Sequence, residues 1–405
     1  MSLLWLAACL SAPFPADPTA LRPPPAPVPS EALGAAEPAP WRDPWAEPRA
    51  ALFARERVVD VAIRLSPSAV EALRRAPRTY VHGSVTLDGE HRERVEVRLK
   101  GSNSFQDIDA KPSFRVHFDT SDEAGGPFRG LERLVLNNMV SDPAQGREIL
   151  AWHALADAGL TVPMVTAARV SLNGEALGVY AMIEPLDAAW LARLGGNAPG
   201  DVWEANDDAD LTPSGLRHFE WGAGVEDTSR LEGLVDALGR EGPFLERTAP
   251  WLDADALVDY LAWIDLIGSL DGYPYTHDDY FLVADPRRDG RFFVVPWGLD
   301  ETWDHAWRAQ WGLGVLSSGC RADAACREAL RARADAGREA FAAMDLPARA
   351  EDLFVRTAPW VAEAARSPWS VEEVTLARAA LVETLRGWPD AVARGAWDPG
   401  PLLAP

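Results

Sequence analysis

Residues 271–303, DGYPYTHDDYFLVADPRRDGRFFVVPWGLDETW, have the pattern of a β-hairpin whose open end is acidic. Apolar and β-branched residues predict strands at 280–284 and 291–295, and the segment 286–290, with its Pro and Gly, predicts the turn between them. Pro296 ends the second strand, because proline has no amide hydrogen to donate to a sheet. The two strand ends of such a hairpin lie roughly 5 Å apart, so the residues that flank them should meet.

Acidic side chains flank both strands at this open end. They are Asp271, Asp278, Asp279, Asp300 and Glu301. Converging carboxylates repel each other unless a cation lies among them. Mg²⁺ suits such a place, since proteins usually hold it with one or two carboxylates together with phosphate oxygens. The alternative is that these residues only cap turns and helix starts, which is common for Asp and expected in a chain with 61 acidic residues.

The composition is that of a globular protein with an acidic surface. Of the 405 residues, 47% are hydrophobic and 25% are charged, which is enough for a large core. The length suits one large domain or two fused lobes. The formal net charge of −22 disfavours contact with nucleic acid and with anionic lipid headgroups. We therefore expect no nucleic-acid partner.

Lysine is nearly absent from the chain. Among 39 basic residues, only Lys100 and Lys111 are lysines, and the rest are arginines. A lysine is a compact point charge that suits a nucleotide phosphate. The alternative is a coding bias toward arginine that left two lysines without a function at a strand edge.

The N-terminal region resembles the start of an exported protein. Cys9 closes the sequence LAAC, a lipobox pattern, although no basic residue precedes it and the apolar run is short. We expect residues 1–9 to be a lipoprotein signal and residues 10–55, rich in Pro and Ala, to be a tether. A lipid at Cys9 would be the membrane attachment, because no run of 18 apolar residues occurs in the sequence. Cys320 and Cys326 would pair in an exported protein and stay free in the cytosol.

A folded region is predicted at residues 56–400, and its first half is rich in strands. Alternating apolar residues predict strands at 58–65, 80–87, 94–99, 113–118, 131–137, 166–172 and 177–183. Ser66 and Pro67 begin a short helix, and a longer helix starts at Ser141 or Asp142 and ends before Gly159. Asn-Gly at 173–174 predicts a tight hairpin turn.

The second half is mainly helical. Helices are predicted at 186–194, 229–238, 253–269, 324–343, 345–365 and 371–386. Residues 195–224 are polar and are expected to form an irregular loop. Strands followed by helices predict the α+β class with two lobes.

Four stretches occur in a fixed order between residues 58 and 303. They are LKGSNSF at 99–105 with KPSFRVHF at 111–118, LERLVLNNMVSDPAQGR at 131–147, VSLNGEALGVYAMIE at 170–184, and HDDYFL at 277–282 with PWGLD at 296–300. Together they resemble the CotH family, spore-coat proteins that are atypical protein kinases of secretory type. One such motif alone is a weak signal, whereas four in order are specific.

The resemblance implies a kinase-like fold with a strand-rich N-terminal lobe at about 56–184 and a helix-rich C-terminal lobe at about 185–400. It implies ATP with Mg²⁺ or Mn²⁺ as cofactors and phosphoryl transfer to Ser or Thr of a surface or coat protein. It also implies an extracytoplasmic location, either as a lipoprotein or in association with a coat.

By the same resemblance, four residues would bind the nucleotide. Lys111 would hold its phosphates, and Glu148 is a candidate partner for Lys111. Lys100 stands where the family usually has Arg, beside a Gly-containing loop whose amides suit phosphate. Glu184 lies where the lobes join, so its surroundings would contact the adenine.

The resemblance also assigns the chemistry to three aspartates. Asp271 would accept the proton of the acceptor hydroxyl, while Asp278 and Asp300 would bind the metal. Asp278 replaces a family Asn, and Gly298 replaces the first Asp of the family's PWDLD segment. These residue types meet the needs of phosphoryl transfer, in which the protein mainly positions groups and neutralises charge.

Two functions from different classes follow. The first is an exported protein kinase, favoured by Lys111, Asp271 and Asp300. The second is a structural or binding protein that keeps the kinase-like fold without turnover, favoured by Gly298. A metal-dependent hydrolase ranks behind both, because the chain has no HExxH motif and no Ser-His-Asp signature.

Overall fold

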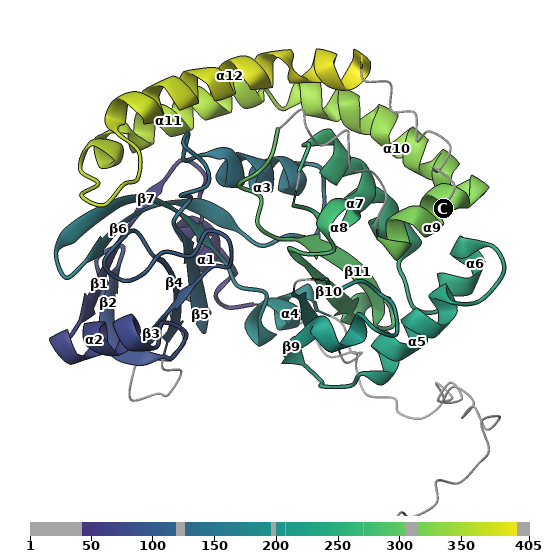
Figure 1. Ribbon diagram of the computed structural model, residues 1–405, viewed down its shortest axis with the longest axis horizontal. Coiled ribbons are helices and arrows are strands. Elements are labelled where there is room, and N and C mark those ends of the chain that lie inside the picture. Colours follow the sequence, from purple (N-terminus) through teal and green to yellow (C-terminus); the bar gives the residue numbers. More distant parts are fainter. Residues whose placement is uncertain are drawn as a thin grey trace, which may run out of the picture. The chain divides into compact units, whose positions relative to one another are not determined.

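A computed structural model gives the fold of residues 43–118, 126–195, 200–206, 208–269, 271–303 and 314–394 (Figure 1). The expected lipoprotein signal, with Cys9, and most of the expected tether lie outside these residues. Within them the fold is α+β, as the sequence predicts. Strands dominate the first half and helices the second.

Seven strands of the first half close into a barrel. In order around it they are β1 (Val58–Leu65), β2 (Val81–Leu87), β3 (Glu90–Lys100), β4 (Ser113–Phe118), β5 (Arg133–Asn137), β7 (Glu175–Ile183) and β6 (Val165–Leu172). The parallel pair β1–β6 closes it. Val59, Val61 and Ile63 are fully buried and alternate with more exposed residues. This period of two lets one face of each strand fill the barrel core.

The short connections follow from local sequence. Ser66 begins α2 (Pro67–Arg75) by accepting a hydrogen bond from the Ala69 amide at 3.1 Å. Asn173 and Gly174 both have positive φ, which is the backbone that a tight β6–β7 turn requires. The Asn173 side-chain oxygen also accepts from the Leu65 amide at 2.8 Å and so holds the turn against β1.

The folded region begins earlier than predicted. Helix α1 (Ala46–Leu52) lies in the segment that the sequence suggested was a tether, and Leu52 and Phe53 are buried in the barrel core. Because the segment is rich in Pro and Ala, the sequence did not predict that Leu52 and Phe53 would be buried. The described fold therefore includes residues 43–55, and the expected boundary at residue 55 is wrong.

Helix α3 (Arg147–Asp157) follows β5 and is buried along most of its length. Its start is fixed by Asp142, whose carboxylate accepts from the Gly146 and Arg147 amides at 2.6 and 2.8 Å. A buried carboxylate at a helix N-terminus satisfies amides that have no partner within the helix. Asp142 was expected to cap this helix, but the helix itself begins only at Arg147.

A four-stranded sheet forms in the second half. Its order is β11 (Arg291–Pro296), β10 (Tyr280–Asp285), β8 (Asp201–Ala205) and β9 (Phe219–Gly224). β10 and β11 form the predicted hairpin, with Tyr280 opposite Pro296 at its open end. The prediction of an irregular loop at 195–224 is wrong, because β8 and β9 lie within it.

The remaining elements are helices, and they enclose a second hydrophobic core around β10 and β11. They are α4 (Ala188–Leu194), η2 (Leu216–His218), α5 (Ser229–Leu238), α6 (Phe244–Thr248), α7 (Ala254–Leu266), α8 (Tyr273–Thr276), η3 (Pro286–Arg288), α9 (Val315–Ala322), α10 (Ala324–Ala343), α11 (Leu346–Ala362) and α12 (Val371–Arg394). A disulfide joins Cys320 of α9 to Cys326 of α10. Among the helices of the described ranges, none combines the length and apolar character needed to cross a membrane.

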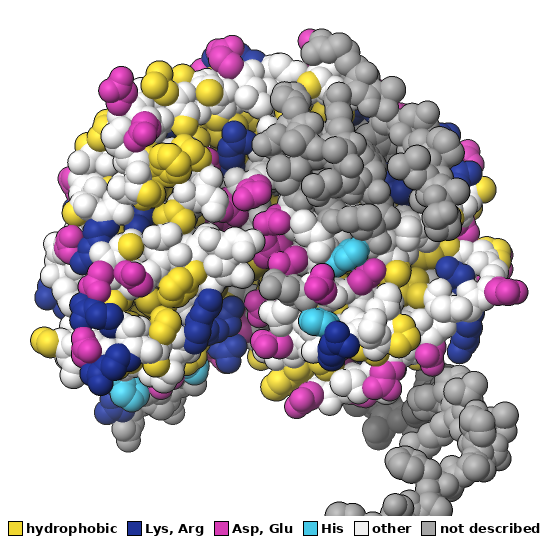
Figure 2. Space-filling model, viewed as in Figure 1, with side chains coloured by type: hydrophobic (Ala, Val, Ile, Leu, Met, Phe, Trp, Pro, Cys, Tyr) yellow, Lys and Arg dark blue, Asp and Glu magenta, His cyan; other side chains and the backbone are white. Residues whose placement is uncertain are grey.

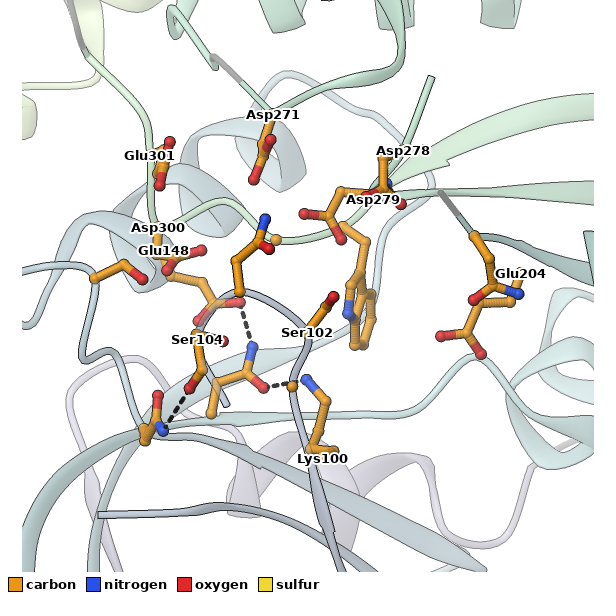
Figure 3. A pocket seen from close by; sticks show the side chains of 18 of the residues that line it. Lys100, Ser102, Ser104, Glu148, Glu204, Asp271, Asp278, Asp279, Asp300 and Glu301 are labelled. Carbon is orange, nitrogen blue, oxygen red and sulfur yellow. Dashed lines mark hydrogen bonds between the residues drawn. The ribbon is translucent and has the colours of Figure 1, made fainter. Parts of the chain in front are cut away.

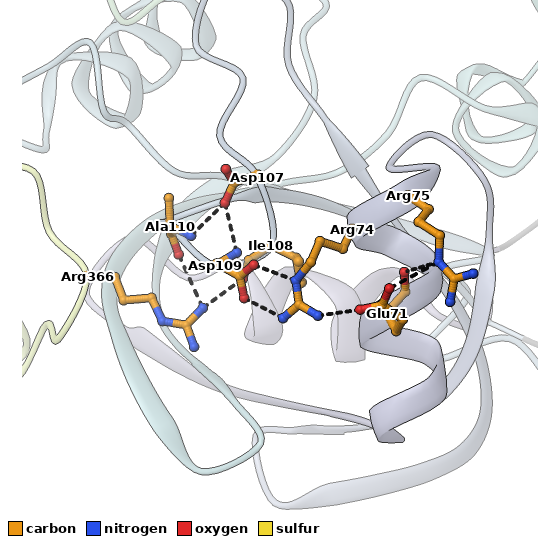
Figure 4. A network of polar contacts seen from close by, with 8 residues as sticks. All are labelled: Glu71, Arg74, Arg75, Asp107, Ile108, Asp109, Ala110 and Arg366. Carbon is orange, nitrogen blue, oxygen red and sulfur yellow. Dashed lines mark hydrogen bonds and ion pairs between the residues drawn. The ribbon is translucent and has the colours of Figure 1, made fainter.

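The connection between α11 and α12 is attached to the barrel (Figure 4). Arg366 donates to the Ile108 carbonyl oxygen at 2.7 Å, and Asp109 beside it forms an ion pair with Arg74 of α2. The Ala365 amide donates to the Ala176 carbonyl oxygen at 2.9 Å at the start of β7. Figure 1 shows α11 and α12 side by side, so this helix pair reaches from the barrel to the helices of the second half.

Candidate active site

A pocket of about 480 Å³ opens where the ends of β3, β4 and β5 face the open end of the β10–β11 hairpin. Its lining is mostly polar and charged. The lining residues are Arg78, Arg98, Lys100, Gly101, Ser102, Asn103, Ser104, Arg115, Asn137, Asn138, Met139, Ser141, Glu148, Glu204, Ala205, Asn206, His218, Glu220, Asp271, Asp278, Asp279, Trp297, Gly298, Asp300 and Glu301. The volume falls within the range of small-molecule and cofactor sites.

One wall of the pocket is acidic. Asp271 precedes α8, Asp278 and Asp279 precede β10, and Asp300 and Glu301 follow β11. Figure 3 shows these side chains gathered on one side of the pocket, with Lys100 and the Ser102–Ser104 loop across from them. In Figure 2 acidic and basic side chains likewise adjoin near the middle of the face shown. The hairpin therefore brings together the carboxylates that flank its strands, as the sequence predicts.

At the acidic wall the ionised form of the carboxyl groups is disfavoured. Burial raises the pKa of Asp271, Asp279 and Asp300, and repulsion from Asp300 raises that of Asp271 further. Burial and the charge of Asp300 raise the pKa of Glu148 to about 8. Desolvation and like charge both favour the protonated form of a carboxyl group. A bound cation would reverse this preference.

Lys100 lies opposite, at the end of β3. Its Nζ donates to Asn137 Oδ1 at 2.6 Å, and Asn137 Nδ2 donates to Glu148 Oε1 at 2.8 Å. The Trp297 ring centroid lies 5.7 Å from Nζ. Burial lowers the pKa of Lys100, and the charge of Glu148 opposes that shift. The side chain is thus fixed by a neutral amide that links it to a carboxylate.

A tight loop after Lys100 adds backbone groups to the pocket. Gly101 has φ of +112°, and a Cβ there would lie 3.1 Å from the Phe105 amide nitrogen, so a side chain would strain the turn. Asn138 Nδ2 donates to the Ser104 carbonyl oxygen at 3.2 Å and to that of Lys111 at 2.8 Å. The Gly-containing loop, whose amides suit phosphate, is therefore held at the pocket.

Three arginines extend the basic side beyond Lys100. Arg98 and Arg115 are directly opposite each other in the β3–β4 register, and Arg78 also lines the pocket. Arg115 lies 4.0 Å from Glu204, at the limit of an ion pair. Like charges at paired positions of a sheet are unfavourable, so this wall favours a bound anion.

The structure does not bring Lys111 to the pocket. Lys111 is 1% exposed, its Nζ donates to the Val179 carbonyl oxygen at 3.0 Å, and the Tyr180 ring centroid lies 5.0 Å away. Burial lowers its pKa to about 7, against the opposing charge of Asp142. In the described part of the chain, the polar contacts of Lys111 do not include the expected one with Glu148, which is linked through Asn137 to Lys100 instead.

Glu184 also lies away from the pocket. It is 2% exposed and forms ion pairs with Arg49, at 3.5 Å, and with Arg193. Its Oε2 accepts from the Met164 amide at 3.3 Å. Its carboxylate is thus occupied by contacts that hold α1 and α4 at the end of the barrel.

The acidic wall differs from a metal site built by protein alone. Among the residues that the structure describes, no group of three or more His, Cys, Asp or Glu residues has the arrangement of a metal centre. Mg²⁺ needs no such group, because it usually keeps water or phosphate oxygens and takes one or two carboxylates. The paired and repelling carboxylates therefore fit a cation that arrives with a phosphate ligand.

Part of the pocket comes from residues that the sequence did not suggest. Glu204, Asn206, His218 and Glu220 belong to β8, β9 and the segment between them. The β-branched and aromatic residues of DVWEA at 201–205 were the available signal for a strand. That signal spans only five residues, and the strand forms through pairing with the distant β10.

The fold and the pocket define an α+β protein with acidic and basic walls facing each other between a β-barrel and a hairpin. The chain belongs to the CotH family, because the family model described as "CotH kinase protein" matches residues 97–346, more than half of the chain. All the charged residues at the acidic wall and Lys100 lie within the matched region.

A curated relative points to the same family. Over 223 residues the chain is 27% identical to "Inner spore coat protein H" of Bacillus subtilis (strain 168). The match covers 52% of this chain and 59% of the relative, so the chain spans about three fifths of that protein's length.

Proposed function

We propose that this chain is an exported atypical protein kinase that transfers the γ-phosphate of ATP to Ser or Thr of surface or coat proteins. One observation carries the proposal: Lys100, with the loop beside it, faces a group of carboxylates across a single pocket. Phosphoryl transfer needs a cation near the phosphates, carboxylates for a metal and a carboxylate near the acceptor. Membership of the CotH family supports it.

The proposal interprets the chain as two lobes. The barrel at about 56–184 would be the N-terminal lobe, and the helices with the second sheet at about 185–400 would be the C-terminal lobe. The pocket takes residues from both, in keeping with a kinase-like site between lobes. The closed seven-stranded barrel departs from the open sheet expected of a kinase N-terminal lobe, so the kinase-like two-lobe fold is part of the proposal.

Lys100 takes the phosphate role in this proposal, in place of Lys111. Its ammonium group lies in the pocket and is positioned by Asn137, while Arg98 and Arg115 extend the basic wall. These groups would bind the phosphates of ATP by charge-assisted hydrogen bonds. Amides of the 101–104 loop would add neutral donors.

The acidic wall would hold Mg²⁺ or Mn²⁺. We propose as ligands Asp300 and one aspartate from the other strand end, a place that the family resemblance gives to Asp278. When bound, the cation neutralises charge that develops on the phosphate oxygens. Asp271 would orient the acceptor hydroxyl and take its proton. Its place beside Asp300 in the same pocket supports this role.

The proposed location is outside the cytoplasm. The Cys320–Cys326 disulfide is the kind of bond that persists in oxidising compartments, and the relative is named as a spore coat protein. A lipid on Cys9 would add a membrane anchor. The protein substrate would then be a coat or surface protein.

The test is transfer of label from γ-labelled ATP, with Mg²⁺ or Mn²⁺, to the chain itself and to a general protein acceptor. Asp271→Asn is the matched control, because it keeps the size of the side chain and removes the base. Label that depends on Asp271 supports the kinase. Absence of label in the wild type under all metal conditions overturns it.

A second function, nucleotide binding without turnover, is favoured by Gly298, which leaves no side chain where the family resemblance expects an acidic one. Such a chain would be a structural or binding protein of the coat. It predicts a rise in melting temperature with ATP and metal but no transfer of label. A kinase would give both the rise in melting temperature and the transfer of label.

A further inference from the structure

Asp279 and Gly298 face each other where the hairpin enters the pocket. The Trp297 amide donates to the Asp279 carbonyl oxygen at 2.7 Å, one step beyond the Tyr280–Pro296 pair that begins the sheet. Gly298 is the next residue, so it lies against the Asp279 side chain. Both residues have left-handed backbones, with φ of +50° and +57°.

The space beside Gly298 is filled by the Asp279 carboxylate. A Cβ at Gly298 would lie 2.4 Å from Asp279 Oδ2 and 2.7 Å from its Cγ. Carbon and oxygen atoms that are not bonded do not approach so closely. A side chain at position 298 and the Asp279 carboxylate in its observed position therefore exclude each other, so any residue other than glycine at 298 would require that carboxylate to move.

The backbone of Asp279 is arranged to aim this carboxylate at the pocket. A non-glycine residue with positive φ is uncommon and carries a conformational cost, which surrounding contacts must hold in place. One such contact is the Asp279 amide, which donates to Asp278 Oδ1 at 2.8 Å. Both aspartates line the pocket. Asp278 uses one carboxylate oxygen to shape the turn. Burial raises the pKa of Asp279, and its carboxylate lies close enough to Asp271 and Asp300 for their charges to raise that pKa further.

We propose that Asp279, together with Asp300, is the carboxylate that contacts the nucleotide-bound cation, and that Gly298 is present because it makes room for Asp279. This rests on the proposed function for the identity of the ligand. Asp278 is then a positioning residue that holds the turn. In this proposal the site keeps its carboxylate although position 298 has no side chain, because Asp279 supplies it from the neighbouring strand end.

The test compares Asp279→Asn with Asp278→Asn in Mn²⁺ titrations of the full chain, with a non-hydrolysable ATP analogue present. Asn at 278 keeps an oxygen that can accept from the 279 amide, so we expect Mn²⁺ affinity to change by less than about threefold, whereas Asp279→Asn should weaken it by at least about tenfold. Both substitutions remove a repelling charge, and thermal unfolding checks that both variants stay folded.

A second pair tests the exchange of positions directly. Asp279→Ala removes the carboxylate and opens space beside 298, and adding Gly298→Asp returns a carboxylate to that space. We expect the double variant to bind Mn²⁺ more tightly than Asp279→Ala alone. Gly298→Asp alone should weaken binding, since it displaces Asp279.

Equal Mn²⁺ affinity of Asp279→Asn and wild type overturns the proposal, as does a larger loss in Asp278→Asn than in Asp279→Asn. A wild type that does not bind Mn²⁺ with the analogue overturns it as well. The label-transfer assay is separate. A wild type that binds Mn²⁺ through Asp279 but transfers no label supports this inference and overturns only the kinase activity.

Discussion

Lys100 and Lys111 lie at the same end of the barrel, yet their surroundings differ. Lys100 pairs with Ser113 at the end of the β3–β4 register, and Lys111 lies two residues before Ser113. Lys100 faces a pocket with carboxylates around it, whereas Lys111 is enclosed with a carbonyl oxygen and the Tyr180 ring as its nearest partners. Burial lowers the pKa of both lysines, but at Lys100 the charges of Glu148 and other pocket carboxylates oppose this shift, whereas at Lys111 the opposing charge is that of Asp142.

The comparison teaches that the position of a lysine in a motif does not determine its role. A lysine that binds phosphate must be reachable by the ligand, and of the two lysines Lys100 lines the pocket whereas Lys111 does not. The four predictions that follow separate the pocket from the barrel interior, and they run from the largest expected effect on phosphoryl transfer to the smallest.

Loss of a carboxylate from the acidic wall should have the largest effect on phosphoryl transfer. Asp300→Ala should lower metal-dependent phosphoryl transfer by about 1,000-fold, because it deletes both a proposed cation ligand and part of the preorganised charge of the site. Steady-state transfer and Mn²⁺ titration measure this. Thermal stability should be unchanged or higher, since a repelling carboxylate is lost. Transfer at the wild-type rate would show that the metal assignment is wrong.

The two lysines themselves give the sharpest test. Lys100→Met should lower kcat/KM for ATP by about 100-fold, because a charge-assisted contact with phosphate is lost. Lys111→Met, the matched control, should change it by less than about threefold, as a side chain outside the pocket predicts. The opposite ranking would return the phosphate role to Lys111.

The Asn137 side chain, which links Lys100 to Glu148, should contribute less to phosphoryl transfer than Lys100 itself. Asn137→Ala removes the amide that bonds both side chains, so we expect about a tenfold loss of transfer, the size of one lost hydrogen bond to a charged group. Asn137→Asp tests the geometry, since it keeps an acceptor for Lys100 but places a second charge beside Glu148. Unchanged kinetics in both variants would mean that Lys100 is positioned by other contacts.

Lys111 should affect stability and its pH dependence more than transfer. Its pKa is about 7 in the folded protein against an ordinary value of 10.5, so between these pH values the unfolded chain binds a proton that the folded chain lacks. The contribution of Lys111 to stability therefore rises with pH across this window. Relative to wild type, Lys111→Met should be more stable near pH 7 by at most a few kcal/mol, since one pKa unit corresponds to about 1.4 kcal/mol.

Urea denaturation of wild type and Lys111→Met at pH 7, 8, 9 and 10 measures this difference. Shifts at other titrating groups cancel when the two chains are compared at the same pH. The stability advantage of the variant should shrink as pH rises. An advantage that stays constant over the series would contradict the depressed pKa.

Local patterns were enough to predict much of this fold. The β10–β11 hairpin, the Asn173-Gly174 turn and the start of α2 each depend on residues adjacent in sequence, so propensity and turn chemistry identify them. The meeting of the acidic residues followed from the hairpin alone. The first strand of the barrel, β1, was likewise clear from its alternation.

Other features depend on contacts between distant residues. β8 and β9 are short, polar in part and stabilised by pairing with β10, which a local pattern does not reveal. The enclosed position of Lys111 depends on β7, whose Val179 and Tyr180 meet it across the barrel. The close approach of Asp279 to Gly298 depends on the backbone geometry of two chain segments. From the sequence alone, Gly298 could therefore be interpreted only as the loss of an acidic side chain.

The helix pair α11–α12 bears on how a shortened version of this protein would behave. The family match stops at residue 346, where α11 begins, but Leu381, Leu385 and Trp388 of α12 are nearly inaccessible to solvent and Arg366 ties the pair to the barrel. A chain cut at the limit of the family match would lack these side chains, expose the core residues that they cover and lose the barrel attachment. Such a fragment should aggregate and be degraded by proteases, so its inactivity would report a failure to fold rather than a failure of chemistry.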